Sequence, residues 1–256
     1  MARAAVDLIP AAWPAPTGVR AGATTRTGGV SAGVFASLNL GDHVHDDASA
    51  VDQNRALLRH ALKLPGDPVW LTQVHGNAVV TLKGTIADSA PRRIADAAIT
   101  RTAGVVCAVL TADCLPVLFC NRAGTHVAAA HAGWRGLASG VLEATVAALD
   151  AAGAPADSLL AWLGPAIGPA SYEVGAEVRD ALLRADPFAE AAFREHRPGH
   201  WLLDLYAAAR ARLHRAGVTA VTGGEYCTRS DRDRFYSYRR DGVTGRQAAL
   251  IWLERS

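Results

Sequence analysis

Cysteine is scarce in this sequence, with four cysteines among 256 residues. Three of them lie in the largely apolar stretch between residues 105 and 136. Small secreted domains that depend on disulfides have many more cysteines for their length, so this pattern does not indicate a disulfide framework. We therefore expect a reducing, cytoplasmic setting.

Long apolar segments are also absent. No uncharged apolar run reaches about 18 residues, so the sequence predicts no membrane span. The first residues contain no continuous apolar core of signal-peptide length, because Pro10, Pro14 and Pro16 interrupt them. Both observations agree with a cytoplasmic protein.

An excess of charge of one sign is missing as well. The formal net charge is +2, lysine is rare and there is no long basic run, so nucleic acid is not an expected partner. The composition, 50% hydrophobic and 20% charged, is typical of a globular protein. No repeat or linker divides the chain, and we expect a single domain over residues 1–256.

The pattern of apolar runs and turn residues predicts an α/β fold. Residues 1–24 are expected to form an extended arm that leads into a first strand. Helices are predicted at 47–63, 136–150, 175–184 and 203–216. Strands are predicted at 19–24, 69–71, 78–82, 97–100, 105–110, 116–119, 127–130, 159–163, 218–221 and 247–253, with a polar surface excursion at 83–95. Because many strands follow one another directly, we expect mixed sheets flanked by helices.

Chemistry is expected where polar residues interrupt the apolar stretch 105–136. Cys114 and His131 each lie at the end of a segment short enough to be a strand, where a rigid sheet can hold a reactive group. Cys107 and Cys120 lie inside apolar runs and are interpreted as small buried hydrophobic residues. His75 lies at a further polar break between two predicted strands.

These residues support two alternatives. Cys114 and His131 alone could be a nucleophile and its general base. With His75 as a third ligand, they would form a zinc site with an open fourth position, which is the catalytic arrangement. The three residues are separated by 39 (114 − 75) and 17 (131 − 114) positions, so the site is not a zinc finger or ribbon.

A series of short motifs, each modest alone, is highly specific in combination. They are Thr25-Arg26 with Gly28-Gly29-Val30-Ser31, SLNLG at 37–41, QVHG at 73–76, Asp96-Ala97, TADCLPV at 111–117, HAGWRG at 131–136, GPAI at 164–167, Cys227-Thr228 and FYSYRRD at 235–241. In these motifs the chain resembles the YfiH/YlmD-like family, whose members are also called laccase-domain or multicopper polyphenol oxidase proteins. The resemblance extends from about Gly18 to Leu253.

The resemblance implies a single YfiH-like α/β domain with mixed sheets. It assigns the family's zinc ligands to His75, Cys114 and His131. It also implies a transferase that cleaves adenosine, inosine, guanosine or methylthioadenosine with phosphate, giving the free base and the sugar phosphate, and that deaminates adenosine. An older assignment in the family is copper-dependent polyphenol oxidation. A third is peptidoglycan editing, which would suit a cysteine hydrolase or amidase.

The sequence departs from the family pattern at His45, where a glycine is common, and at Ala103 and Arg229. None of these positions is one of the three ligands.

Deamination needs a carboxylate to carry a proton, and Asp113 is the nearest one in the sequence. Neighbouring residues of a strand point to opposite faces. Asp113 and Cys114 can therefore both reach the site only if the strand has ended in a turn. A structural hydrogen-bonding role for Asp113 is the alternative.

Phosphorolysis needs cations for the phosphate, and the arginines at Arg26, Arg135, Arg239 and Arg240 are candidates. For Arg239 and Arg240, which follow Tyr238 in a highly charged segment, the alternative is a solvated surface.

Other polar and aromatic residues of the motifs are candidates for the nucleoside. Asn39 and Gln73 could bind ribose hydroxyls or the base edge, and Trp134 could stack on a purine or lie in the core.

Copper fits the residues less well than zinc. A multicopper oxidase needs several metal centres, whereas the nine histidines are mostly scattered. A single site of two histidines and one cysteine could still take copper, which binds such ligands tightly. The sequence therefore predicts a zinc enzyme whose partners are purine nucleosides and phosphate, with neither nucleic acid nor a membrane as partner.

Overall fold

The computed structural model describes residues 5–84 and 93–255. Most of the surface excursion predicted at 83–95 lies outside the described residues. Among the described residues, no helix combines the length and the apolar character needed to cross a bilayer.

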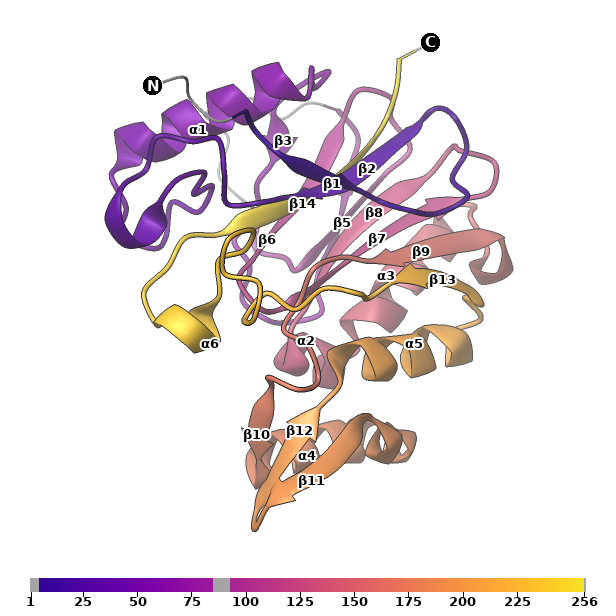
Figure 1. Ribbon diagram of the computed structural model, residues 1–256. Helices are drawn as coiled ribbons and strands as arrows, with labels where there is room; N and C mark the ends of the chain where they lie inside the picture. Colours follow the sequence, from indigo (N-terminus) through magenta and orange to yellow (C-terminus); the bar gives the residue numbers. More distant parts are fainter. Residues whose placement is uncertain (1–4, 85–92, 256) are drawn as a thin grey trace.

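Two large sheets dominate the fold (Figure 1). The first consists of Leu8–Pro10 (β1), Val19–Thr24 (β2), Gln247–Leu253 (β14), Val106–Thr111 (β6) and Pro68–Val69 (β3), in that spatial order. The second consists of Ala220–Gly223 (β13), Leu159–Leu163 (β9), Leu115–Asn121 (β7), Val127–Ala132 (β8), Ala97–Thr100 (β5) and Val79–Leu82 (β4). The pairs β3–β6, β4–β5 and β9–β13 are parallel and the others antiparallel, so both large sheets are mixed, as predicted.

A third, small antiparallel sheet lies apart from the other two at the bottom of Figure 1. It contains Glu173–Gly175 (β10), His200–Leu203 (β12) and Phe193–Arg197 (β11). The helices are Ala48–Ala61 (α1), Trp134–Ser139 (α2), Val141–Ala151 (α3), Ala176–Ala185 (α4), Leu205–Arg215 (α5) and Tyr238–Asp241 (α6). Short 3₁₀ turns occur at Gly33–Phe35, Ala156–Ser158 and Pro187–Ala192.

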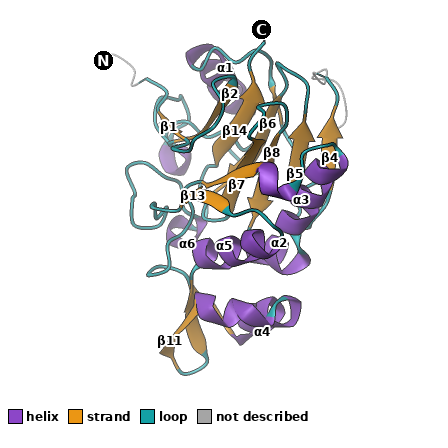
Figure 2. Ribbon diagram, turned by 90° about the vertical axis from the view of Figure 1, so that its right-hand side faces the viewer, coloured by secondary structure: helices purple, strands orange, loops and turns teal. Residues whose placement is uncertain are grey.

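The layers follow the order helix, sheet, sheet, helix (Figures 1 and 2). Strand β7 is buried on both faces because each face packs in a different core. Leu118 faces a core shared with the other large sheet, whereas Phe119 faces a core shared with α3 and α5. On the far side of the first sheet, Leu250 packs in a third core with Leu58 of α1. A strand covered on both faces reads as a continuous apolar run, which made these strands recognisable in the sequence.

One expectation about local structure was wrong. The single helix predicted at 136–150 is two helices, because Gly140 has φ +84° and its left-handed conformation ends α2 before α3 begins. The N-terminal arm is extended, as expected, and within it β1 pairs with β2. The small sheet was not predicted. Its strand β11 is mostly exposed and charged, so it carries no apolar pattern.

The strand register brings distant segments to one end of the second sheet. In the antiparallel pair β7–β8, Pro116 lies opposite His131, so the residue before β7, Cys114, lies next to the end of β8. In the pair β5–β8, Ala97 lies opposite Ala130. Asp96, which precedes β5, therefore lies beside His131.

Candidate metal centre

Three side chains converge at this end of the second sheet. The potential ligand atoms of His75, Cys114 and His131 all lie within 4.8 Å of one another. His75 lies in the loop before β4, Cys114 in the turn before β7, and His131 near the end of β8. The structure thus brings together the three residues that the sequence proposed as ligands.

A buried carboxylate orients two of these ligands. Asp96 Oδ1 lies 2.9 Å from His131 Nδ1 and also accepts a hydrogen bond from the backbone N of His75 at 2.9 Å. Asp96 Oδ2 accepts from the backbone N of Gly76 at 2.8 Å. With its Nδ1–H donated to the carboxylate, His131 keeps Nε2 as the nitrogen for a metal, the arrangement usual for metal-binding histidines.

The electrostatics of the group favour the thiolate form of Cys114. Burial raises the pKa of the thiol, but the charge and hydrogen bonds of His131 and His75 outweigh burial and hold the pKa below its ordinary value. Burial lowers the pKa of His131, yet Cys114 and Asp96 outweigh it and hold that pKa above its ordinary value. The thiolate is the form of cysteine that binds metals and attacks electrophiles.

Gly133 has no side chain, and this leaves room for Cys114 and His75. A Cβ atom at this position would lie 2.7 Å from Cys114 Sγ and 3.3 Å from His75 Cδ2. A larger residue would therefore displace two of the three ligands.

The group suits a tetrahedral metal ion. Typical bond lengths of about 2.0–2.3 Å place the ligand atoms of a zinc site about 3.3–3.7 Å apart, which a small inward adjustment of the side chains achieves here. Two nitrogens and one sulfur leave a fourth coordination position free. The donor set accepts zinc or copper and does not by itself distinguish them.

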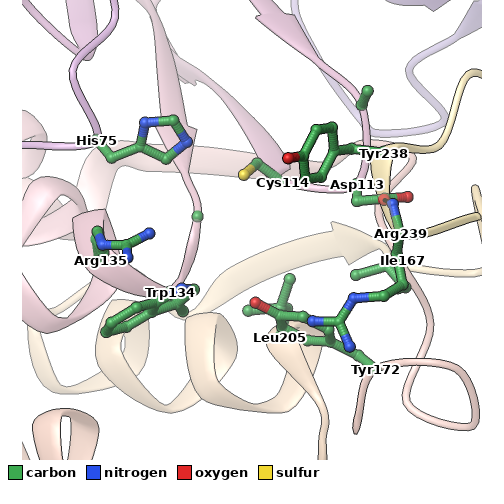
Figure 3. Close-up of a pocket in the computed structure, with 12 residues that line it drawn as sticks. His75, Asp113, Cys114, Trp134, Arg135, Ile167, Tyr172, Leu205, Tyr238 and Arg239 are labelled. Carbon is green, nitrogen blue, oxygen red and sulfur yellow. Dashed lines mark hydrogen bonds between the residues drawn. The ribbon is translucent and has the colours of Figure 1, made fainter. Parts of the chain in front are cut away.

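The group opens on a cavity of about 240 Å³ (Figure 3). His75, Cys114 and Gly133 line one part of it. Another part of the wall carries two arginines, each with its guanidinium over an aromatic ring. Arg135 lies 4.3 Å from the ring centre of Trp134, and Arg239 lies 5.1 Å from that of Tyr172. These four residues also line an adjoining cavity of about 410 Å³ beside the small sheet.

Comparison with known proteins identifies the family. Residues 20–254 match the family described as multi-copper polyphenol oxidoreductase laccase. The chain belongs to this family. It is 56% identical over 245 residues to a purine nucleoside phosphorylase of Pseudomonas aeruginosa, with 94% of this chain and 96% of that protein covered. It is 53% identical over 246 residues to the purine nucleoside phosphorylase YfiH of Escherichia coli K12, with 96% and 98% covered.

Solved structures of related proteins have the same fold. A Neisseria meningitidis protein that is 50% identical superimposes with a TM-score of 0.89, covering 97% of this chain and 99% of that one. YlmD from Geobacillus stearothermophilus, 37% identical, has a TM-score of 0.87 with 93% of each chain covered. These matches confirm the predicted YfiH/YlmD-like family and its mixed α/β fold.

In this laccase-family chain, three of the residues predicted to bind substrate line the cavity. They are Arg135, Tyr238 and Arg239. Tyr238 is 62% exposed, so a ligand in the cavity can reach it. Arg239 also reaches away from the metal group, where its NH1 donates to the backbone O of Glu173 at 2.6 Å.

Four other predicted residues are not part of this wall. Their side chains bind groups of the surrounding loops and strands. Arg26 Nε donates to Ala36 O at 2.9 Å, and Gln73 pairs through both its amide atoms with the backbone of Leu110. The binding roles of Arg26 and Gln73 stay predictions.

Asn39 and Arg240 are held in the same way. Asn39 is fully buried and bonds the backbone of Gly41 and the backbone N of Arg246. Arg240 donates to Thr228 O at 2.9 Å. Their roles in binding likewise stay predictions.

Asp113 lies in the turn between β6 and β7, as its proposed access to the site required. Its φ is +90°, the residue is 8% exposed, and its carboxylate accepts three hydrogen bonds. These hydrogen bonds fit the structural role that the sequence left as an alternative, and proton transfer by Asp113 stays a prediction.

Sequence reasoning missed four residues of the site. Asp96 had one signal, a carboxylate directly before an apolar strand, whereas Gly133 and Tyr172 lie in turns and loops without periodicity. Arg246, which precedes β14, donates from NH1 to the backbone O of Thr244 and Gly245 at 3.0 Å. Burial lowers the pKa of Arg246, and the negative charges of Cys114 and Asp113 oppose that shift.

Proposed function

We propose that this protein is a zinc-dependent purine nucleoside phosphorylase. The observation that carries the proposal is the group formed by His75, Cys114 and His131, two of which, His75 and Cys114, line a cavity that two arginines line as well. Relatives with 46–56% identity over nearly their whole length are named purine nucleoside phosphorylases. We place the protein in the cytoplasm, in keeping with its four free cysteines.

The reaction would join phosphate to C1′ of adenosine, inosine, guanosine or methylthioadenosine. The C1′–O bond forms, the bond from C1′ to the purine nitrogen breaks, and the base leaves with that electron pair and takes a proton. Arg135 and Arg239 present guanidinium groups to the same cavity, and such groups match the geometry of phosphate oxygens. Trp134 and Tyr172, whose rings lie beneath these guanidiniums, add apolar surface to the cavity that a purine can contact.

The chain's contribution at the metal is to hold it with one position open. A zinc ion bound by His75, Cys114 and His131 would supply Lewis acidity toward an oxygen atom at that position. Asp96 fixes the orientation of His131, and Gly133 keeps the space between the ligands free. In this function Cys114 is a bound thiolate and not an attacking nucleophile. Deamination of adenosine at the same site is a second proposed activity, with C6 of the purine turned toward the open position.

The test is to replace Cys114 or His131 with alanine and to measure bound metal together with the conversion of adenosine and phosphate to adenine and ribose 1-phosphate. We expect both variants to lose the metal and the turnover. A matched control is Cys120→Ala, which removes a thiol from the buried core between the sheets and should leave both intact. Phosphorolysis by metal-free protein would sink the proposal.

Copper-dependent phenol oxidation is the second candidate, favoured by the description of the family. Within the described residues, His75, Cys114 and His131 form a single group suited to a metal, which is fewer centres than a multicopper oxidase needs. Oxidase activity that rises with copper loading, without phosphorolysis, would support this candidate. A cysteine hydrolase or amidase of peptidoglycan editing would instead keep its activity after chelation and lose it when Cys114 is alkylated.

A further inference from the structure

Asp113 connects the metal group to the opposite wall of the cavity. It directly precedes Cys114, and its own backbone O accepts a hydrogen bond from Ile167 N at 2.9 Å. Its side chain is buried although it carries a carboxylate, which is unusual unless the group is fully hydrogen-bonded.

The carboxylate meets three donors from two other segments. Oδ1 accepts from Thr228 Oγ1 at 2.6 Å. Oδ2 accepts from Ser237 Oγ at 3.0 Å and from the backbone N of Arg239 at 2.6 Å. Two of the donors thus come from the residues that begin α6, and the third comes from the loop after β13.

These segments carry the wall that faces the metal group. Tyr238 and Arg239 line the cavity. Arg239 donates its own backbone N–H to Asp113, and Tyr238 lies between Arg239 and Ser237, which Asp113 also binds. Ile167, held by the Asp113 backbone, lines the cavity as well. In Figure 3, Asp113 lies next to Arg239 and between Tyr238 and Ile167.

We propose that Asp113 is a positioning residue, whose carboxylate sets the distance between the metal ligand Cys114 and the substrate wall formed by Tyr238 and Arg239. Hydrogen bonds to a charged acceptor are stronger than neutral ones, so three of them fix this spacing firmly. The inference rests on the proposed phosphorylase function, and it gives Asp113 a role other than proton transfer.

All three donors lie outside the metal group, so their hydrogen bonds hold the Asp113 carboxylate toward the cavity wall and not toward the metal ligands. Oδ1 faces a hydroxyl group from outside the metal group, and Oδ2 already accepts twice. The two roles therefore predict different kinetics. Loss of positioning weakens substrate binding, whereas loss of a proton carrier slows the chemical step and removes a limb of its pH profile.

The first experiment uses Asp113→Asn, which keeps the size of the side chain and removes its charge. We expect the KM for adenosine and phosphate to rise about 10- to 100-fold, because charged hydrogen bonds are lost. Zinc content should stay full, and the pH profile of kcat should keep both limbs. Asp231→Asn is the matched control. Asp231 binds Arg234 on the surface of the same charged segment, and its replacement should leave KM unchanged.

A second variant, Thr228→Val with Ser237→Ala, leaves the Asp113 carboxylate in place and removes two of its partners. We expect the same rise in KM as in Asp113→Asn. A wild-type KM in this double variant, together with a kcat limb lost in Asp113→Asn, would make Asp113 the proton carrier and overturn the inference. Loss of zinc in Asp113→Asn would also overturn it.

Hydrogen exchange separates this inference from the proposed function, because it needs no activity. In Asp113→Asn we expect faster amide exchange at 227–230 and 235–241, with unchanged protection of β8. Unchanged exchange in both segments would refute the positioning role even if the wild-type protein is a phosphorylase. Absence of adenosine phosphorolysis in the wild-type protein, with the faster exchange present, would refute the function and leave the positioning role standing.

Discussion

Asp96 shows how much of the candidate metal centre rests on a residue that is not one of its proposed ligands. One carboxylate orients the ring of His131 and holds the backbone of His75 and Gly76. The convergence of His75, Cys114 and His131 could be predicted, because they belong to recognisable motifs and stand at polar breaks. Asp96 could not be assigned this role from its sequence context, since the register that places it beside His131 is set by strands far apart in the chain.

We predict that Asp96→Asn lowers zinc affinity about 10- to 100-fold, because partners of metal-bound histidines typically contribute this much. The amide keeps the shape of the side chain but loses the charge that stabilises the orientation of His131. Competition with a chromophoric chelator measures the affinity. Asp150→Asn, at an exposed position of α3, is the control, and equal affinity in the two variants would contradict the role of Asp96.

Gly133 gives a sharper test, because its backbone tolerates a side chain. Its φ of −69° is open to every residue type, so Gly133→Ala introduces no backbone strain. The added methyl group would instead meet Cys114 Sγ at 2.7 Å. We predict that the variant folds but has lost most of its bound metal. Circular dichroism checks the fold, and elemental analysis measures the metal. Full metal content in this variant would show that the ligands lie elsewhere.

At the scale of elements, the central strands were predicted well because both of their faces are buried. Strands β5, β9 and β14, buried at every residue, occur at the predicted residues, and so does β2, in which Arg20 is exposed. The small sheet was missed because β11 is exposed. The cavity wall could be predicted only in part, since Tyr172 reaches it from a loop that no local pattern encodes. Departure from the family pattern at His45 has a visible consequence, as this residue has φ +69°, a conformation that favours glycine.

The break between α2 and α3 gives a prediction about backbone conformation. Gly140→Ala should destabilise the protein by about 1 kcal/mol, because a Cβ atom is unfavourable at its φ of +84°. Urea unfolding measures the loss. Gly18→Ala is the control, as its Cβ atom would meet nothing within 4 Å and its φ lies outside the left-handed range. If Gly140→Ala were as stable as Gly18→Ala, the break would not depend on glycine.

At the scale of the whole molecule, a bound metal joins segments that are distant in the sequence. His75, Cys114 and His131 come together only in the folded sheet, so the metal binds the folded state in preference to the unfolded one. Free zinc at 100 times its dissociation constant should add about 2.7 kcal/mol of stability. For a domain of this size that corresponds to a rise in Tm of about 5–10 °C.

This increment should depend on pH in a defined direction. In the metal-free site the pKa of His131 lies above its ordinary value, because Cys114 and Asp96 outweigh burial. A proton must leave before the metal binds, so zinc affinity falls as the pH falls, and the rise in Tm shrinks with it. Thermal unfolding with zinc or with a chelator, repeated between pH 8 and 5, measures the effect. In His131→Ala the zinc-dependent rise should vanish at every pH. A rise of the same size in that variant would mean that the stabilising metal binds outside the group formed by His75, Cys114 and His131.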